Sequence, residues 1–481
     1  MKNRAFVFMF CALTFANTPH SKGSAGTFDT MNKSTVSIKI KSTVSTYGKA
    51  GVFTGTGFIV DKKLGFIATN KHIVFPNSVA QYEIKFSNGV SVKAQRYYVD
   101  PIHDFAYLKI DPKKIPESCT EVTFAQSGPR VGDRVMMIGS NGGKESSYLE
   151  GTISNTLDSA GEFPSKTIFI AFSSKPGSSG SPLFNSNTEV VGIHFGSNFN
   201  TTGFALPASY LIDALSYLRK QATPSRYKLG AWLKYSQISK SVEFLKFPQK
   251  QADEYNKHHP DAHGMHLLVE SVEAGSPADN ALKVGDIVLE INDTKQTADL
   301  YLFEKAVDES KGKGITLKVV RFGEEKVIKI QPTTFNNSAF NRFVLWAGAV
   351  FYEADEYVAS LSGIKTGSVV VTNITEGSSI YNSSTYSIAP CSGPLPILVH
   401  VTKINDKEIA NLNDLIKIIK DSPETKLPFI IKNYMAIGNY NSAINTNRTE
   451  LYIPVDLTGL DAGPFLFEFD EKTYDWQKKS I

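Results

Sequence analysis

The fold of this chain is best approached from Lys175-Pro-Gly-Ser-Ser-Gly-Ser-Pro-Leu183. Gly177 and Gly180 stand on either side of Ser179, and glycine permits tight backbone turns that a side chain would obstruct. Such a turn would expose the Ser179 hydroxyl and direct the amides of Gly177 and Ser179 at one point, as an oxyanion hole requires. Taken alone, the same residues are typical of an ordinary flexible loop.

A serine nucleophile needs a neighbouring base and a third group that orients this base. The apolar run that starts at Phe66 ends in His72, which can act as a general base at the rim of a sheet. Asp104 directly precedes an alternating apolar strand, where its carboxylate can hold the imidazole tautomer. Singly, the histidine is more simply structural and the aspartate more simply a turn or capping residue. In the chain, Asp104 follows His72 by 32 residues (104 minus 72), and Ser179 follows Asp104 by 75 (179 minus 104). The order His, Asp, Ser with these gaps is hard to obtain by accident.

The sequence therefore predicts a catalytic triad of His72, Asp104 and Ser179, with Gly177 and Ser179 supplying the oxyanion hole. Ser178 and Ser181 remain rival nucleophiles, because both lie in the same loop.

Length and composition limit the class of protein. A chain of 481 residues is too long for one hydrophobic core, and its 41% hydrophobic and 20% charged content is that of globular protein. A net charge of +4 without a cluster of basic and aromatic residues argues against nucleic acid as a partner. Because neither a phosphate-binding glycine loop nor a His/Cys metal spacing is present, we expect no cofactor and no metal.

The N-terminus has basic residues, an apolar run from Ala5 to Leu13 and then small residues, which is the pattern of a signal peptide. We expect this signal to occupy residues 1–22 and the mature protein to be periplasmic or secreted. The alternative is a disordered start that happens to be apolar. No apolar stretch reaches the ~20 residues that a membrane helix needs, so no membrane span is expected in the mature chain.

The remaining sequence divides into segments of different texture. Short β-type runs broken by Gly, Asn and Asp fill residues 27–222 and predict a mostly β barrel or sandwich, closed by a helix over 206–218. Two later segments, 226–335 and 340–456, share the order strand, Gly-Ser turn, strand ending in Ile-Asn, helix. They are related α+β modules, or unrelated segments that use similar turns. Residues 457–481 show no clear periodicity and receive no function.

Several of these motifs together resemble the HtrA/Deg family of serine proteases, over nearly the whole chain. The resemblance is carried by Gly55-Thr-Gly-Phe-Ile-Val60, Ala68-Thr-Asn-Lys-His-Ile-Val74, His103-Asp-Phe-Ala-Tyr-Leu-Lys109, Gly177-Ser-Ser-Gly-Ser-Pro182 and Gly203-Phe-Ala-Leu-Pro207. Two motifs, Asp100-Pro-Ile-His-Asp-Phe105 and Gly177-Ser-Ser-Gly-Ser-Pro182, are most similar to the fungal nuclear and plant multi-domain Deg branch. The resemblance implies a trypsin-like double β-barrel followed by two PDZ-like modules, and it carries nucleophile, base and orienting acid onto Ser179, His72 and Asp104.

The resemblance also implies further sites. It places the floor of the primary specificity pocket near Ser173, with Phe195, Gly196 and Ser197 on its wall. Because no aspartate stands at this floor, small or medium apolar side chains are expected in the pocket rather than Arg or Lys. In the first PDZ module, Leu229 and Gly230 match the loop that receives a peptide carboxylate. The second module is more divergent, with an extra segment over 388–396.

The expected function is an ATP-independent serine endopeptidase that cleaves unfolded or misfolded proteins in quality control or a stress response. Its partners would be unfolded polypeptides and peptide C-termini, and the family implies a homo-oligomer. Two other functions compete with it. One is a peptide-binding adaptor or holdase on a latent protease scaffold, and the other is a processing protease with one specific substrate.

Overall fold

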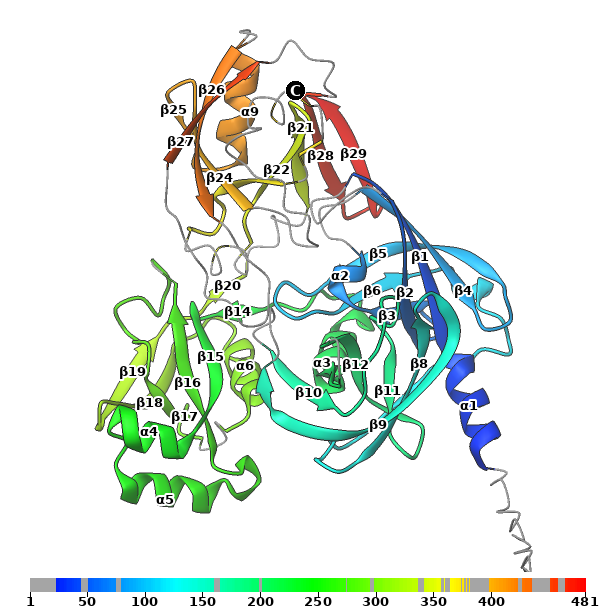
Figure 1. Ribbon diagram of the computed structural model, residues 1–481, viewed down its shortest axis with the longest axis vertical. Coiled ribbons are helices and arrows are strands. Elements are labelled where there is room, and N and C mark those ends of the chain that lie inside the picture. The colour runs from blue at the N-terminus through cyan, green and yellow to red at the C-terminus, as the bar shows by residue number, and fades with distance from the viewer. Residues whose placement is uncertain are drawn as a thin grey trace, which may run out of the picture.

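The structure is a computed structural model of the whole chain. It describes residues 23–481 except 45–50, 75–78, 160–164, 199–200, 274, 295–297, 336–340, 356–358, 360–363, 373, 376–377, 379, 381–397, 423–425, 435–449 and 457–462. Two β-barrels, an α+β module and a second β-rich module follow one another along the chain (Figure 1).

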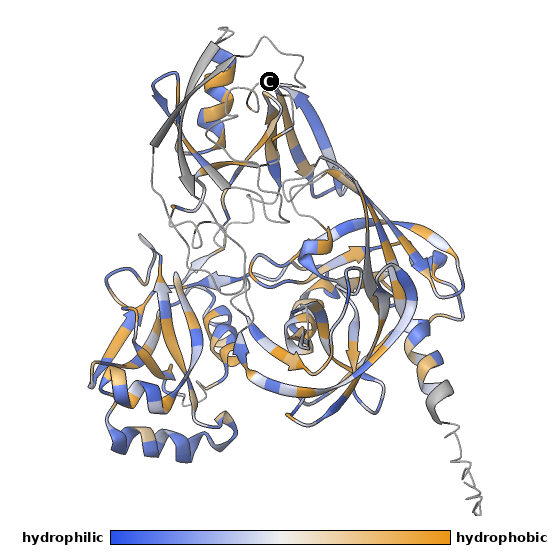
Figure 2. Cartoon of the chain, viewed as in Figure 1, coloured by the Kyte–Doolittle hydropathy of each residue, from blue (hydrophilic) through white to orange (hydrophobic). Residues whose placement is uncertain are grey.

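The first barrel follows the N-terminal helix α1 (Gly23–Ser34). Its strands close in the order β1-β2-β3-β6-β5-β4. They are β1 (Thr35–Val44), β2 (Gly51–Asp61), β3 (Phe66–Thr69), β4 (Val79–Phe86), β5 (Ser91–Val99) and β6 (Ala106–Lys109), with the short helices α2 (Lys71–Val74) and η1 (Pro112–Lys114) outside the sheet. Apolar and polar residues alternate along β1 and β4 (Figure 2), since one face of each strand points into the barrel. Strand β3 is buried along its whole length.

The second barrel has the order β11-β8-β9-β10-β13-β12, closed by pairing of β11 with β12, while β7 adds to its edge. Its strands are β7 (Thr123–Phe124), β8 (Arg134–Asn141), β9 (Lys144–Ser159), β10 (Lys166–Ile170), β11 (Pro182–Phe184), β12 (Glu189–Ser197) and β13 (Gly203–Pro207). The predicted closing helix is present as α3 (Ala208–Leu218), which starts directly after Pro207. Proline lacks an N–H, and at the start of a helix this N–H would have no intrahelical acceptor. The prediction of a mostly β fold with a trypsin-like double barrel is confirmed.

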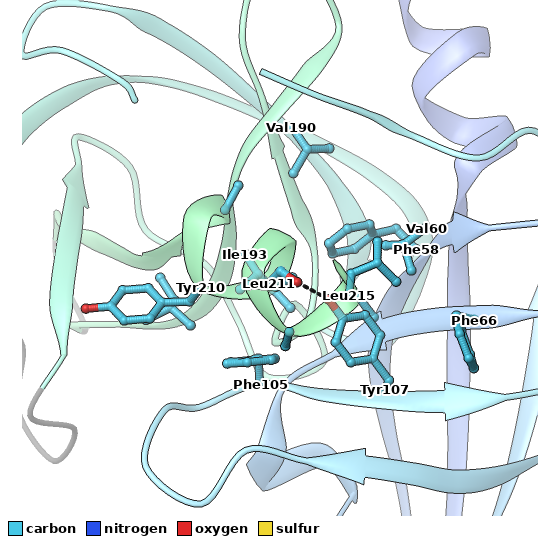
Figure 3. Packing of buried hydrophobic residues seen from close by; sticks show 14 of the residues in the cluster. Phe58, Val60, Phe66, Phe105, Tyr107, Val190, Ile193, Tyr210, Leu211 and Leu215 are labelled. Carbon is cyan, nitrogen blue, oxygen red and sulfur yellow. Dashed lines mark hydrogen bonds between the residues drawn. The ribbon is translucent and has the colours of Figure 1, made fainter. Parts of the chain in front are cut away.

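Helix α3 packs into the seam between the two barrels (Figure 3). Phe58 and Tyr107 of the first barrel and Ile193 of the second share one buried cluster with Leu211 and Leu215 of the helix. The hydroxyl of Tyr107 donates to the carbonyl oxygen of Leu211 at 2.7 Å, so this buried polar group is satisfied. The barrels are thereby held in one orientation, on which any site between them depends.

A five-stranded sheet, ordered β15-β16-β17-β18-β19, follows the barrels. The elements of this module are β14 (Tyr227–Lys228), β15 (Ala231–Gln237), α4 (Ile238–Leu245), α5 (Gln249–His258), η2 (Pro260–Ala262), β16 (Met265–Val272), β17 (Ile287–Ile291), α6 (Leu300–Glu309), β18 (Ile315–Arg321), β19 (Glu324–Ile330) and β20 (Thr333–Thr334). Asp299 accepts bonds from the amides of Tyr301 and Leu302 and so caps α6.

The last module has strand order β27-β26-β24-β23-β22-β21-β28-β29, with β25 beside β24. Its elements are β21 (Arg342–Trp346), β22 (Ala349–Glu353), β23 (Val369–Thr372), β24 (Leu398–Ile404), β25 (Lys407–Glu408), α9 (Leu412–Asp421), β26 (Lys426–Tyr434), β27 (Glu450–Asp456), β28 (Phe465–Asp470) and β29 (Asp475–Ser480). The C-terminal segment, for which the sequence indicates no regular pattern, thus extends this sheet. The extra segment over 388–396 lies outside the described residues.

The C-terminal hairpin β28–β29 also reaches the first barrel (Figure 1). The Arg96 guanidinium lies 3.5 Å from the ring centroid of Phe469, and the rings of Tyr97 and Tyr474 are 5.2 Å apart. No helix among the described residues is long and apolar enough to cross a membrane.

Candidate active site

His72 and Asp104 meet at one end of the first barrel. Helix α2 places His72 just after β3, and Asp104 lies in the turn that leads into β6, the neighbour of β3. The Nδ1 atom of His72 lies 2.7 Å from Oδ2 of Asp104, and the backbone N–H of His72 donates to Oδ1 at 3.0 Å. The Asp104 side chain is only 1% exposed, whereas that of His72 is 40% exposed. The carboxylate is therefore buried behind an imidazole that solvent can reach.

Ser179 lies in the loop between β10 and β11 of the second barrel, and Thr56 of β2 ties this loop to the first barrel. The N–H of Thr56 donates to the carbonyl oxygen of Ser179 at 2.8 Å, and its hydroxyl donates to that of Gly177 at 2.8 Å. The Thr56 hydroxyl in turn accepts from the N–H of Ser140 at 2.9 Å. The Ser179 hydroxyl, which is half-buried, donates to the carbonyl oxygen of Phe195 at 3.3 Å.

The serine loop has the backbone shape for which the two glycines were singled out. Gly177 has φ +99° and Gly180 has φ +88°. A Cβ atom at these positions would lie 2.2 Å from the oxygen of Ser140 and 1.9 Å from that of Thr56, respectively, so no other residue fits. Within the described part of the chain, no acceptor is bonded to the amide of Gly177 or to that of Ser179. Both N–H groups are thus available to a ligand oxygen.

The rival serines sit differently. Ser178 and Ser181 are 1% and 0% exposed. The Ser178 hydroxyl donates to Oδ1 of Asn141 at 3.0 Å, which also accepts from the N–H of Lys175 at 2.6 Å. Two buried hydroxyls cannot reach a substrate, so the half-buried Ser179 is the favoured nucleophile of the loop.

The residues expected around the specificity pocket form a polar wall beside Ser179. The Ser173 hydroxyl donates to the carbonyl oxygen of Asn198 at 3.4 Å, and the Ser197 hydroxyl donates to that of Ser174 at 3.0 Å. The half-buried Phe195 and Gly196 precede Ser197 on the neighbouring strand β12. Neither Asp nor Glu belongs to this wall.

Three residues near the site were not predicted to take part in it: Thr56, Ser174 and His194. Nε2 of His194 lies 2.7 Å from the hydroxyl of Ser174. Burial lowers the pKa of His194 to about 3, so its imidazole is neutral at physiological pH. One signal could have pointed to it, because His194 interrupts the apolar run from Val190 to Ile193. Thr56 carries no such signal, since threonine is common in strands.

The expected carboxylate loop of the first α+β module lies close to the turn of the first barrel that contains Ile102 and His103. Gly230 has φ +80°, and its carbonyl oxygen and that of Leu229 accept from the amides of Glu273 and Ala278 at 2.8 Å each. A cavity of about 60 Å³ lies between this loop and α6. Its lining includes Leu229 and Phe303 of the module and Ile102 and His103 of the first barrel. Across the described residues, no group of three or more His, Cys, Asp or Glu side chains is arranged to hold a metal.

Comparison with known families identifies two domains in the chain. The family model of the trypsin-like peptidase domain matches residues 55–193, and that of the PDZ domain matches residues 249–331. The first range contains all three residues of the predicted triad. The second covers α5, the strands β16 to β19 and helix α6.

Two of the similar proteins are fungal. A pro-apoptotic serine protease, NMA111, of Vanderwaltozyma polyspora is 28% identical over 78% of this chain and 37% of the relative. Its counterpart in Saccharomyces cerevisiae (strain YJM789) is 29% identical over 89% of this chain and 44% of the relative. The chain thus spans less than half the length of these relatives. Among solved structures, an HtrA-type protease, AlgW with a tripeptide, is 21% identical over 65% of this chain and 97% of that chain, with a TM-score of 0.49.

These relatives contradict one expectation. The prediction of a periplasmic or secreted protein is wrong, because the curated relatives are fungal proteins named pro-apoptotic serine proteases, not periplasmic or secreted proteases. The predicted signal peptide, residues 1–22, lies outside the described residues. A short apolar run after a few basic residues is a compositional signal, and composition alone does not specify a compartment.

Proposed function

Since this chain belongs to the HtrA/Deg family of trypsin-like serine proteases, we propose that it is a serine endopeptidase with Ser179 as nucleophile, His72 as base and Asp104 as orienting acid. The observation that carries the proposal is the 2.7 Å contact between His72 and a buried Asp104. The loop that carries Ser179 is hydrogen-bonded through Thr56 to the same barrel that holds this His72–Asp104 pair. The adaptor or holdase alternative does not need this arrangement.

In the proposed reaction, Ser179 Oγ attacks the carbonyl carbon of a peptide bond while Nε2 of His72 takes the hydroxyl proton. The Asp104 carboxylate holds Nδ1–H of His72 and stabilises the imidazolium. The amides of Gly177 and Ser179 donate to the oxyanion, which stabilises it by about 3 to 4 kcal/mol per donor. The imidazolium then protonates the leaving amine as the C–N bond breaks, leaving an acyl-enzyme. His72 then takes a proton from water as the water oxygen attacks the ester carbon. The resulting imidazolium protonates Ser179 Oγ as the acyl–oxygen bond breaks and the carboxylic acid leaves.

The primary specificity proposed for this site is for small or medium side chains without positive charge. Burying a Lys or Arg side chain is costly unless a carboxylate pairs with it. The wall formed by Ser173, Ser174 and Ser197 supplies hydroxyl groups, and His194 is neutral because burial lowers its pKa to about 3. No described group of this wall can neutralise a substrate cation.

For the PDZ domain we propose binding of peptide ends at Leu229 and Gly230, in the mode in which a peptide adds to a sheet edge. Unfolded polypeptides are then the proposed substrates, since their ends and apolar side chains are accessible. Cleavage of such chains is the role of a quality-control or stress protease. The second module is proposed to be a divergent PDZ-like scaffold. A homo-oligomer is also proposed, and light scattering of the purified chain measures it.

The test is degradation of reduced casein by the purified chain, beside Ser179→Ala and Ser181→Ala. We expect Ser179→Ala to abolish both cleavage and labelling by a fluorophosphonate. Ser181→Ala, a matched change in the same loop, should be labelled as the unmodified chain is. Cleavage that persists in Ser179→Ala would refute the nucleophile. Tight casein binding without cleavage or labelling would favour the adaptor, and a single cut in one folded protein would favour a processing protease.

A further inference from the structure

A buried ion pair links the segment after the protease domain to the turn that carries Asp104. Arg226 Nε lies 2.9 Å from Oδ2 of Asp100, and its Nη1 lies 2.6 Å from Oδ2 of Asp308 in α6. The side chains of Arg226, Asp100 and Asp308 are 11%, 0% and 18% exposed. This guanidinium therefore lies between the turn that precedes Asp104 and helix α6 of the PDZ domain, largely shielded from bulk water.

Asp100 is the residue that shapes the turn. Its Oδ1 accepts from the backbone N–H groups of Ile102 at 3.0 Å and His103 at 2.8 Å. Its Oδ2 accepts from the hydroxyl of Tyr98 at 2.9 Å. Its own N–H donates to the carbonyl oxygen of Phe105 at 3.2 Å, across Asp104. One carboxylate thus sets the backbone path directly before Asp104.

The pair is charged on both sides. Burial by itself raises the pKa of Asp100, but the Arg226 guanidinium and the hydrogen bonds from the backbone N–H groups of His103 and Ile102 more than offset this, so the pKa lies below its ordinary value. Burial likewise opposes the charge of Arg226, but Asp100 and Asp308 hold its pKa well above the ordinary value. Without the guanidinium, Asp100 would be a buried carboxylate that has lost its cationic partner from the segment after the protease domain.

We propose that Arg226 is a positioning residue for catalysis, which holds Asp104 against His72 by fixing the Asp100 turn. The inference rests on the proposed protease function and extends it, because it makes the catalytic geometry depend on a residue between the trypsin-like domain and the PDZ domain. Family models of the two domains end at residue 193 and begin at residue 249, so Arg226 belongs to neither match.

A merely structural role is the competing explanation. Lys71 Nζ donates to the carbonyl oxygen of Pro101 at 3.1 Å, and Asn70 Nδ2 donates to that of Asp104 at 2.8 Å. If these bonds sufficed to hold the turn, loss of Arg226 would loosen the contact between the modules and leave the chemistry unchanged. The two explanations differ in kcat and in its pH dependence.

The experiment measures kcat, KM and the pH profile of kcat for peptide cleavage by the full chain, its Arg226→Met and Arg226→Lys variants and Tyr301→Phe. Tyr301 donates to Oδ2 of Asp213 at 2.6 Å, so Tyr301→Phe removes another bond between α6 and the barrels without touching the turn. For Arg226→Met we expect kcat to fall roughly 10- to 100-fold, the loss that a small misplacement of a catalytic group causes.

The other readouts distinguish a positioning role of Arg226 from a merely structural one. KM should stay near that of the unmodified chain, and the acid limb of the profile should move to lower pH, since an imidazolium farther from Asp104 is less stabilised. Arg226→Lys should recover part of kcat, and Tyr301→Phe should retain all of it. An unchanged kcat and acid limb in Arg226→Met would overturn the proposal, as would an equal loss in Tyr301→Phe.

Two controls keep the test decisive. If Arg226→Met does not fold, the Asp100→Asn/Arg226→Met double variant avoids leaving the fully buried Asp100 carboxylate without its cation, and the same kcat and pH readouts apply to it. Asp308 loses the same cation but is 18% exposed and still accepts from the N–H of Tyr227 at 2.8 Å. An unmodified chain that neither cleaves peptide nor reacts with a fluorophosphonate would refute the protease proposal itself. An active unmodified chain with unaffected variants would refute only the role of Arg226.

Discussion

The Nδ1 atom of His72 lies 2.7 Å from Oδ2 of Asp104, although 32 residues separate the two in the chain. Strands β3 and β6 pair antiparallel, with Thr69 opposite Ala106. His72, three residues past the end of β3, and Asp104, two residues before the start of β6, therefore come together at one end of the barrel. The pairing of these two strands places the proposed base beside its proposed orienting acid.

Replacement of Asp104 by asparagine should lower kcat by about 10⁴-fold, the loss seen when an orienting aspartate of a serine protease becomes an amide. The packing should not change, because the side chains of aspartate and asparagine have nearly the same shape. If the amide oxygen accepts from the N–H of His72, the amide NH₂ faces Nδ1, and Nε2 then carries the proton that the base should lack.

The measurement is kcat on a peptide substrate beside Asp111→Asn. Asp111 is exposed and accepts from the N–H of Lys113 in η1, away from the site, so its variant should retain full activity. A similar kcat for Asp104→Asn and the unmodified chain would remove Asp104 from the mechanism.

Thr56→Val should weaken both stability and catalysis. Valine has the shape of threonine but leaves the N–H of Ser140 without its acceptor and the carbonyl oxygen of Gly177 without its donor. Each unsatisfied buried group costs about 1 to 3 kcal/mol in the free energy of unfolding. The serine loop would shift, and kcat should fall by roughly 10- to 100-fold.

Urea unfolding and kcat measure the two effects of Thr56→Val. The matched control is Thr54→Val, in the same strand β2 at an exposed position, which should change neither quantity. Equal behaviour of the two valine variants would show that the link through Thr56 is dispensable.

Gly177→Ala should reduce kcat by about 10² to 10³-fold, as loss of an oxyanion donor does. The new Cβ atom would lie 2.2 Å from the carbonyl oxygen of Ser140, at a φ of +99° that alanine rarely adopts. The backbone must therefore move and carry its amide away from the oxyanion position. Gly128→Ala is the control, since no atom lies within 4 Å of its added methyl group. The kinetics of both variants are measured on the same peptide. A fully active Gly177→Ala variant would contradict the proposed oxyanion hole.

Acid should destabilise the fold through its buried histidines. Burial lowers the pKa of His103 and of His194 to about 3 from 6.5, so both are neutral in the folded chain and charged in the unfolded chain below pH 6.5. The unfolded state then binds more protons, and the free energy of unfolding falls by roughly 1.4 kcal/mol per pH unit for each histidine as the pH drops from 6.5 towards 3.

Chemical unfolding at several pH values measures this slope. His103→Gln should remove the share of one histidine and so flatten it, whereas His258→Gln, at an exposed position, should leave the slope unchanged. An equally steep slope in His103→Gln would mean that carboxylates, rather than this imidazole, govern the acid sensitivity.

Much of the architecture could be predicted from the sequence because its signals are local. Pro207 followed by apolar residues at helical spacing predicted the helix that runs from Ala208 to Leu218. The glycines around Ser179 predicted a tight turn, and both have positive φ angles. The order strand, strand, helix in the two later modules is present as β16, β17, α6 and as β23, β24, α9. The compartment was predicted wrongly, since the N-terminal pattern is compositional.

The sequence by itself determined which residues are the candidates for the proposed chemistry: a histidine after an apolar strand, an aspartate before another, and a serine between glycines. Their periodicity and turns depend on near neighbours in the chain. Only the tertiary structure decided that Thr56 ties down a loop 121 residues away and that Arg226 reaches Asp100 across 126 residues. Such pairs form because buried polar groups and charges require partners, and packing of the barrels against α3 and α6 selects which partners come within reach.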